Sequence, residues 1–120
     1  MRRDIMCNET KIAEIKDRVY QANRRLPEEG LVKLTWGNVS EIDRKLKIVV
    51  IKPSGVPYDE LKPEDMVVCD LQGKTIEKPS LKPSSDLLTH LMLYQQFKDI
   101  SAIVHTHSSH AVAWAQSGRE

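Results

Sequence analysis

The residues of this sequence that are best suited to chemistry lie in its last third. His105 and His107 follow a short apolar run at residues 101–104, which is typical of a buried strand. Side chains two residues apart in a strand point to the same face, so we expect the two imidazoles to point into one place. Asp86 stands at a predicted helix start. One carboxylate and two neutral imidazoles are a donor set that zinc uses at catalytic sites, which predicts a metal centre.

Each of these features also has an ordinary structural interpretation. A His-x-His pair is common in solvent-exposed strands, and an aspartate in the first turn of a helix is common capping chemistry. The helix between Asp86 and the strand spans about three turns, so the chain can return His105 and His107 towards Asp86. His90, four residues after Asp86, shares its helix face and is a further candidate ligand, ranked below the strand pair.

Three turns carry groups suited to binding an anion. Gly37 and Asn38 offer backbone N–H groups and a side-chain amide at a strand entrance. The segment Lys52-Pro53-Ser54-Gly55 adds a lysine, a hydroxyl and a glycine N–H, although it is equally good turn chemistry. Ser84 or Ser85 can cap the free N–H groups of the following helix. We therefore expect one concave anion site next to the metal donors, lined by Asn38, Ser54, Gly55, Ser84 and Ser85.

The N-terminal part of the chain is predicted to begin with an amphipathic helix over residues 8–26. Apolar residues recur there at spacings of three and four, and Pro27 and Gly30 end the pattern. Residues 31–51 are predicted to form strands, with a hairpin turn at Asp43-Arg44-Lys45. A strand at residues 66–71 should turn at Gln72-Gly73 into a second arm at residues 74–76.

The C-terminal part is predicted to contain a helix over residues 87–97, the strand before His105, and a last helix through residues 111–115. Ser108 or Ser109 can cap this last helix, which should stop at Ser117-Gly118. This order predicts a layered α/β/α architecture with a largely antiparallel, mixed sheet and helices packed on it. No glycine-rich turn joins a strand to a helix, which excludes a Rossmann unit.

The composition predicts an ordinary globular domain. The 120 residues are 40% hydrophobic and 29% charged, with a formal net charge of +1, so no disorder class fits and one domain is expected. No long run of like charges predicts a nucleic-acid or membrane partner, and no apolar segment approaches the ~20 residues that span a bilayer. Cys7 and Cys69 lack CxxC spacing, which favours two unpaired thiols and a cytoplasmic location.

Four motifs in order resemble the L-ribulose-5-phosphate 4-epimerases of the class II aldolase/epimerase family, over about residues 15–118. They are Thr35-Trp36-Gly37-Asn38-Val39-Ser40, Ile51-Lys52-Pro53-Ser54-Gly55, Lys82-Pro83-Ser84-Ser85-Asp86 and Ile103-Val104-His105-Thr106-His107. The resemblance implies a class II aldolase-like fold and a metal-dependent isomerase of pentose and arabinose catabolism. Such an enzyme converts L-ribulose 5-phosphate to D-xylulose 5-phosphate by breaking and re-forming the bond to C4.

The resemblance also implies roles for particular residues. The substrate phosphate is expected against Gly37, Asn38, Ser54, Gly55, Ser84 and Ser85, with Lys52 close by. Asp86, His105 and His107 match the metal ligands of the family, usually for Zn²⁺, with other divalent cations such as Mn²⁺ as alternatives. The expected partners are a pentulose phosphate and further copies of the chain in a homotetramer.

The chain departs from the family pattern in its length. Family members continue into a later half that carries a further histidine ligand and the aspartate and tyrosine expected to transfer protons. Residues 1–120 are therefore expected to be the N-terminal portion of one class II aldolase-type domain, with the C-terminal part absent. No family proton-transfer residue is expected before Glu120, so this chain alone should bind metal weakly and turn over little substrate. If it were fully active, the candidates would be Tyr20, Tyr58, Asp70 and His90.

Two other functions compete with epimerisation. A class II aldolase such as fuculose-phosphate aldolase uses the same chemistry but releases the aldehyde, and aldolases of this family resemble one another in carrying Glu where this chain has Asp86. A non-catalytic interaction module, as in the adducin head, keeps the fold and loses the ligands. The presence of Asp86, His105 and His107 favours an enzyme, and the aspartate favours the epimerase.

Overall fold

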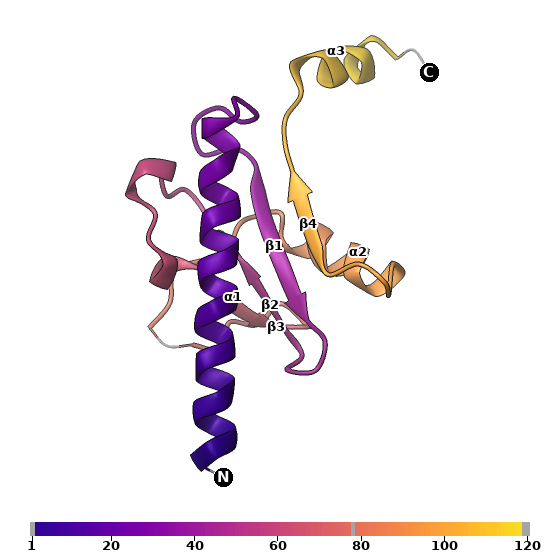
Figure 1. The fold of residues 1–120 in the computed structure, drawn as a ribbon. Coiled ribbons are helices and arrows are strands. Elements are labelled where there is room, and N and C mark those ends of the chain that lie inside the picture. The colour runs from indigo at the N-terminus through magenta and orange to yellow at the C-terminus, as the bar shows by residue number, and fades with distance from the viewer. Residues whose placement is uncertain (1, 78, 119–120) are drawn as a thin grey trace.

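A four-stranded sheet with a helix on each face forms the centre of the molecule (Figure 1). The structure is a computed structural model and describes residues 2–77 and 79–118; residues 1, 78, 119 and 120 of the predicted domain lie outside this part. The helices are α1 (Arg2–Glu28), α2 (Leu87–Gln96) and α3 (Ser109–Ser117), with short 3-10 turns η1 (Tyr58–Glu60) and η2 (Pro63–Asp65). The strands are β1 (Asn38–Asp43), β2 (Ile48–Ile51), β3 (Val67–Asp70) and β4 (Ala102–His105).

The strands lie in the order β3-β2-β1-β4, and every pair among the described residues is antiparallel. The predicted layered α/β class is confirmed, and the sheet is more uniformly antiparallel than the mixed one expected. β4 lies beside β1 with His105 opposite Asn38. This register brings a predicted metal ligand next to a predicted anion-binding residue, although they are far apart in the sequence.

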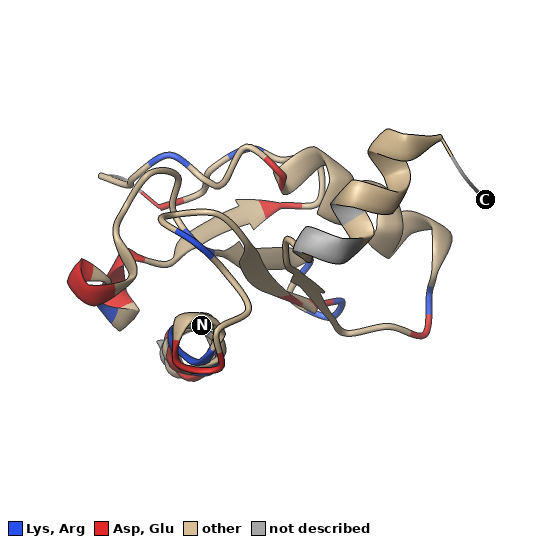
Figure 2. Cartoon of the chain, turned by 90° about the horizontal axis from the view of Figure 1, so that it is seen from above, with Lys and Arg blue, Asp and Glu red and all other residues tan. Residues whose placement is uncertain are grey.

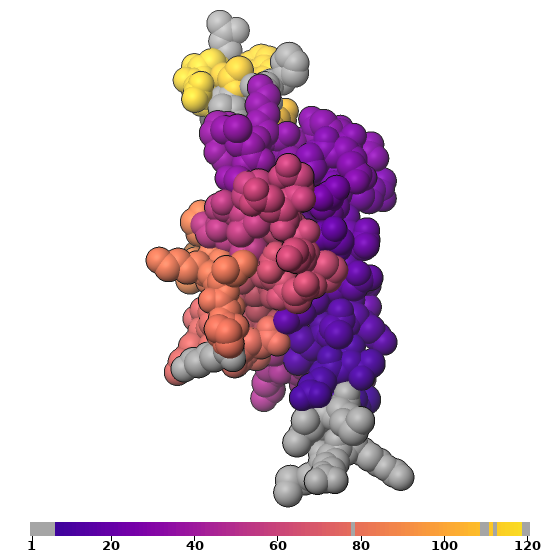
Figure 3. Space-filling model, turned by 90° about the vertical axis from the view of Figure 1, so that its left-hand side faces the viewer, coloured from indigo at the N-terminus to yellow at the C-terminus, as the bar shows by residue number. Residues whose placement is uncertain are grey.

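Both faces of the sheet are mostly buried over β1, β2 and β3, because alternate strand residues pack against different helices. Val50 and Val68 belong to a core cluster with Ile15 and Val19 of α1. The neighbouring strand residues point to the opposite face and pack against α2; this second cluster includes Val49, Ile51, Val67, Cys69, Leu87, Leu91 and Tyr94. Figure 3 shows α1 lying alongside the segment that carries η1 and η2. The sheet is thus the middle layer of three.

The segment at residues 31–35 is not a strand, contrary to the prediction. It forms a loop and turn between α1 and β1, in which Leu34 has a positive φ of 54° and the N–H of Trp36 donates to the carbonyl of Lys33. Gly37 follows with a φ of 82°. Left-handed backbone cannot continue a strand, so extended pairing starts only at Asn38. The chain instead curves around one end of the sheet.

The other element boundaries differ from the predictions by smaller amounts. α1 is longer than residues 8–26, because it starts at Arg2 and includes Pro27 in its last turn. β2 starts at Ile48, after a turn in which Lys47 has a φ of 57°. The arm predicted at residues 74–76 makes only the isolated bridge Cys69↔Thr75, because the Asp70 carboxylate accepts the N–H of Lys74 and tightens the turn.

α3 lies beyond the end of the sheet, away from α1 and α2 (Figure 1). The hydroxyl of Ser108 accepts the N–H of Ala111 at 3.3 Å, and the helix ends at Gly118 with a φ of 71°. Both features confirm the predicted capping of this helix.

Charged residues of both signs are interspersed along the chain (Figure 2). No helix in the described part is both long and apolar enough to cross a membrane.

Candidate anion and metal site

Backbone pairing joins two of the three predicted anion-binding turns. The N–H of Ser54 donates to the carbonyl of Lys82 at 2.9 Å, and the N–H of Ser84 donates to the carbonyl of Lys52, also at 2.9 Å. Pro53 and Pro83 form the isolated bridge between these bonds. The residues that face each other in such a bridge do not bond to each other through their N–H groups, so proline is tolerated at both positions, and the two flanking bonds hold the turns side by side. Ser54 and Ser84 are neighbours for this reason.

Asn38 connects the third turn to the turn that contains Ser84 and Asp86. Its Nδ2 donates to Ser84 Oγ at 3.0 Å and to Asp86 Oδ2 at 2.7 Å. Asn38 is only 3% exposed, and its Oδ1 has no hydrogen-bond partner among the described residues. A buried polar atom without a partner costs free energy unless a ligand or water satisfies it. Asn38 therefore has the unfilled hydrogen-bonding capacity expected at a ligand site.

The three turns enclose one cavity of about 240 Å³. It is lined by all seven residues predicted to bind the substrate, namely Gly37, Asn38, Lys52, Ser54, Gly55, Ser84 and Ser85, together with Asp86 and His107. Thr35, Trp36 and Pro53 complete the lining. The predicted meeting of these turns is thus observed, whereas anion binding by them stays a prediction.

Gly37 could not be replaced by another residue without moving its surroundings. A Cβ built on it would lie 2.3 Å from Val32 Cγ1 and 3.0 Å from the carbonyl oxygen of His105, and its φ of 82° disfavours any side chain. The glycine thus allows the loop before β1 to pass closely against the end of β4. This close passage brings the backbone of the first turn to the cavity.

Lys52 is a buried cation at the cavity wall. It is 2% exposed, and its Nζ donates to the carbonyls of Thr35 at 3.4 Å and Pro53 at 3.3 Å. In the described part of the chain no carboxylate forms an ion pair with it. Burial lowers the pKa of Lys52, because its charged form loses solvation without gaining a counter-charge. An anion in the cavity would supply that counter-charge.

Asp86 stands at the start of α2, but it does not cap the helix with its side chain. It occupies the N-cap position, which was predicted for Ser84 or Ser85, and its carboxylate makes no capping bond. Oδ2 instead accepts from Asn38 Nδ2 and lies 2.8 Å from Nδ1 of His105. The Ser84 hydroxyl accepts the N–H of Asp86. The carboxylate is therefore turned away from the helix and towards the cavity.

The environment of Asp86 favours its ionised form. Desolvation by burial acts to raise the pKa of its carboxyl group, but the hydrogen bonds from Asn38 and His105 outweigh it. The resulting pKa is below the ordinary value. A carboxylate that is ionised and already bonded by two donors is suited to bind a cation and is a weak base.

His105 and His107 lie close together, but only His105 is in the strand. β4 ends at His105, so the predicted alternation along one strand does not place His107, which belongs to the following loop. Their ring centroids are nevertheless 4.9 Å apart. Loop geometry and the neighbouring Trp36 ring, whose centroid is 5.7 Å from that of His107, hold the second imidazole near the first.

These donors fit a zinc ion in type, and in part in arrangement. Asp86 and His105 are in direct contact, and His107 lies beside His105 and lines the same cavity as Asp86. Among the described residues, however, no three His, Cys, Asp or Glu side chains are grouped as a ready metal site. Asp86 and His105 each use on the other an atom that could bind the ion. This contact uses one oxygen of Asp86 and the Nδ1 of His105, and ligation by all three side chains stays a prediction.

His90 is directed into the core and does not line the cavity. Its Nδ1 is 2.6 Å from Ser40 Oγ, which is also 2.7 Å from the hydroxyl of Tyr94. His90 and Asp86 are spaced to share a helix face, but the packing of α2 on β1 directs the His90 side chain into the core. The hydroxyl of Ser40 supplies the partner of the His90 imidazole there.

Two aromatic residues were given no binding role from the sequence, where Tyr58 was named only as a candidate for proton transfer. Trp36 lines the cavity and contacts His107, and it could have been suspected because it stands inside the Gly37-Asn38 motif. The Tyr58 hydroxyl donates to the carbonyls of Trp36 and Gly37, at 2.8 and 2.9 Å. Local spacing carries no information on that contact, since Tyr58 is 21 residues from Gly37.

Three polar turns of this layered fold thus converge beside one carboxylate and two imidazoles. The chain belongs to the class II aldolase and adducin N-terminal domain family, which matches residues 17–120. The resemblance stated from the four motifs is therefore confirmed at the level of the family.

Curated relatives include L-ribulose-5-phosphate 4-epimerases. The chain is 55% identical over 105 residues to UlaF of Salmonella paratyphi C (strain RKS4594), which covers 88% of this chain and 46% of that protein. UlaF of Salmonella choleraesuis (strain SC-B67) matches with the same identity and coverage. The chain thus spans about half the length of the curated relatives it matches.

Solved structures with the same fold include aldolases. An L-fuculose 1-phosphate aldolase superimposes with a TM-score of 0.81 and 36% identity, over 88% of this chain and 50% of that one. The L-fuculose-1-phosphate aldolase from Thermus thermophilus has a TM-score of 0.62 and 30% identity, over 81% of this chain and 48% of that one. YgbL from Klebsiella pneumoniae, described as a putative aldolase/epimerase/decarboxylase, has a TM-score of 0.76 and 26% identity, over 87% and 49%.

Proposed function

We propose that the chain is the phosphate-binding and metal-binding part of an L-ribulose-5-phosphate 4-epimerase. The observation that carries this proposal is the single cavity in which the three polar turns, the buried Lys52 and Asp86 come together. The 55% identity to proteins named as this epimerase supports the choice of substrate. The full-length enzyme is proposed to be a cytoplasmic homotetramer that uses zinc.

The phosphate end of the substrate is assigned to the three turns. Ser54, Ser84 and Ser85 offer hydroxyls, and Lys52 offers an ammonium without a carboxylate partner in the described part of the chain. Charge-assisted hydrogen bonds to phosphate are shorter and stronger than neutral ones. Binding energy at this end, remote from the reacting carbons, serves to orient the sugar.

The reacting end of the substrate is assigned to the side of the cavity where Asp86 and His107 lie. Asp86, His105 and His107 would hold a divalent ion, which when bound supplies a positive charge that stabilises negative charge on sugar oxygens. Asp86 contributes a carboxylate whose lowered pKa keeps it ionised. Asn38 donates to the same carboxylate oxygen as His105 and so orients it.

The environment of Asp86 also supports the choice of an epimerase over an aldolase of this fold. An aldolase needs a group that protonates the released fragment, and a carboxylate with a lowered pKa and two hydrogen-bond donors is poorly suited to it. Epimerisation returns the aldehyde to the same carbon without that step. The short Asp86 side chain therefore favours the epimerase over the fuculose-phosphate aldolase suggested by structural likeness.

An activity assay on an extended chain tests this function. The chain joined to the C-terminal half of a UlaF relative is expected to convert L-ribulose 5-phosphate to D-xylulose 5-phosphate, and a chelator should abolish the conversion. Asp86→Asn should lower kcat at least ~100-fold, as loss of an electrostatic partner commonly does, whereas Glu9→Gln, on the exposed surface of α1, serves as the matched control. Cleavage of L-fuculose 1-phosphate without epimerisation would instead assign the aldolase.

A further inference from the structure

Tyr58 is a buried phenol that contacts two separate parts of the proposed anion site. Its hydroxyl donates to the carbonyls of Trp36 and Gly37, at 2.8 and 2.9 Å. The face of its ring lies 4.8 Å from Nζ of Lys52. Trp36, Gly37 and Lys52 all line the cavity, whereas Tyr58 does not. The Tyr58 side chain lies outside the cavity lining and contacts both the turn that contains Gly37 and the ammonium of Lys52.

The hydroxyl and the ring of Tyr58 each contact a group that has few other partners among the described residues. Gly37 lies in left-handed backbone just after a loop, and the carbonyls on either side of the Trp36–Gly37 junction are held by the Tyr58 hydroxyl. Lys52 Nζ has two long contacts to carbonyls, and in the described part of the chain it forms no ion pair with a carboxylate. An aromatic face attracts an ammonium through its quadrupole, more strongly when water is excluded. The ring thus favours the charged form of Lys52 inside the protein.

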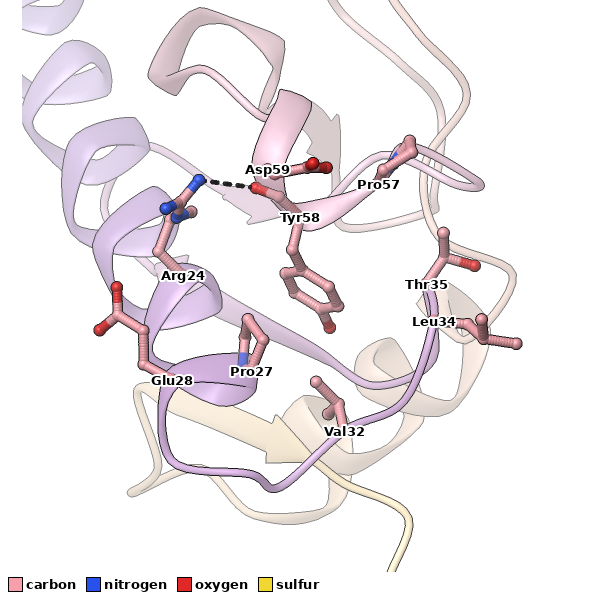
Figure 4. Close-up of a pocket in the computed structure, with 9 residues that line it drawn as sticks. All are labelled: Arg24, Pro27, Glu28, Val32, Leu34, Thr35, Pro57, Tyr58 and Asp59. Carbon is pink, nitrogen blue, oxygen red and sulfur yellow. Dashed lines mark hydrogen bonds between the residues drawn. The ribbon is translucent and has the colours of Figure 1, made fainter.

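The backbone of Tyr58 is held in place by a residue of α1. Its carbonyl accepts from Arg24 Nη1 at 3.0 Å, as drawn in Figure 4. The ring stands between α1 and the loop that carries Val32, Leu34 and Thr35, and it forms a wall of a separate cavity of about 570 Å³ (Figure 4). α1, η1 and the loop before β1 therefore all converge on this residue.

Proton transfer does not suit Tyr58. Its hydroxyl is occupied by two carbonyls and lies outside the lining of the substrate cavity. Burial also raises the pKa of the phenol to about 12, so the group stays protonated and donating. Such a side chain can hold its neighbours in place, but it cannot act as a base at neutral pH.

We propose that Tyr58 is a positioning residue that aligns the Gly37 turn and the Lys52 ammonium for one anion, through its hydroxyl and its ring respectively. The inference rests on the proposed function of the cavity as a phosphate site. It assigns separate tasks to the two ends of one side chain, which two substitutions can separate.

Titration with inorganic phosphate, followed by amide chemical shifts of the 120-residue chain, tests the inference. Tyr58→Phe removes the hydroxyl and keeps the ring; it should weaken phosphate binding about fivefold, the effect of one hydrogen bond, and reduce the response of the Gly37 amide. The pH titration of the Lys52 Cε shift should not change. Tyr58→Leu should weaken binding further and lower the pKa read from Lys52.

Tyr94→Phe is the matched control, because Tyr94 is also a buried phenol with a hydroxyl partner, but it belongs to α2 and contacts Ser40 of β1. It should lower thermal stability and leave phosphate affinity unchanged. If Tyr58→Phe binds phosphate as the original chain does, or if Tyr94→Phe weakens binding equally, the inference is wrong while the proposed function stands. If the original chain gives no phosphate response at the cavity, both the proposed function and the inference are wrong.

Discussion

At the scale of single residues, Lys52 shows a conflict between stability and binding. Its charge is buried at 2% exposure without a carboxylate partner among the described residues, and burial lowers its pKa. Lys52→Met should abolish the phosphate response and yet raise the free energy of unfolding at neutral pH by ~1 kcal/mol, because the uncompensated charge is removed. Urea unfolding and phosphate titration of both chains measure the two effects. A less stable variant that still binds phosphate would contradict this account.

The sign of the pH dependence follows from the same lowered pKa. Between the pKa of Lys52 in the folded chain and its ordinary value of 10.5, the unfolded chain binds more protons than the folded chain. The stability of the original chain should therefore rise with pH in that window, relative to Lys52→Met. The difference between the two chains should be largest near neutral pH and shrink towards 10.5.

His90 should make the fold sensitive to acid. Burial lowers its pKa from 6.5 to about 4, partly opposed by the charge of Asp86. The neutral imidazole is thus favoured in the folded chain, and its contribution to stability is complete above 6.5 and is lost as the pH falls towards about 4. We expect a loss on the order of 3 kcal/mol across this range. Urea unfolding at several pH values measures it, and His90→Gln should show a clearly flatter profile.

At the scale of elements, Asn23 joins α1 to the start of β1. It is fully buried; its Nδ2 donates to the carbonyls of Val19 at 2.8 Å and Val39 at 3.3 Å, and its Oδ1 accepts the N–H of Val39 at 2.9 Å. The side chain thus takes the place of a neighbouring strand beyond the end of β2. Because Val39 follows Asn38, this contact also sets the position of the cavity wall.

Replacement of Asn23 should therefore affect both stability and binding. Asn23→Ala leaves the backbone of Val39 without its partner and should lower the free energy of unfolding by ~2–3 kcal/mol. It should also weaken phosphate binding. Asn8→Ala, at an exposed position of the same helix, is the control and should change stability by less than about 0.5 kcal/mol. Thermal and urea unfolding compare the two, and equal losses would show that Asn23 only maintains the helix.

At the scale of the whole molecule, β4 is the outer strand of the described sheet on one side. Val104 of this strand is 60% exposed, because it lies opposite Val39 but beyond the reach of α1. An open strand edge with exposed apolar side chains favours pairing with other chains. We expect the 120-residue chain to self-associate as its concentration rises.

A charge on this edge should reduce the association. Val104→Lys is expected to lower the apparent mass measured by light scattering at high concentration, with little change in the unfolding temperature. Leu88→Lys removes a comparably exposed apolar side chain, 72% exposed, from α2 and serves as the control. If the two variants reduce the mass equally, general surface hydrophobicity rather than the edge of β4 drives the association.

The sequence by itself determined the parts of the fold and site that depend on local spacing. The apolar period of α1, the short apolar runs of the strands and the cap of α3 at Ser108 all depend on neighbours a few residues away, which periodicity and turn chemistry describe. The four motifs also sufficed to identify the family and the donor types of the cavity.

Only the tertiary structure decided how those parts meet. The bridge between Pro53 and Pro83, the burial of Lys52 and the contact of Tyr58 with Gly37 join residues that are distant in sequence. Long-range contacts can also replace a local one. The Asp86 carboxylate stands at the N-cap of α2 but bonds to Asn38 and His105 and does not cap the helix. The physical reason is that each side chain can bond or pack with local or with distant partners. Local sequence pattern describes only the local partners, so it cannot show which of them the folded chain uses.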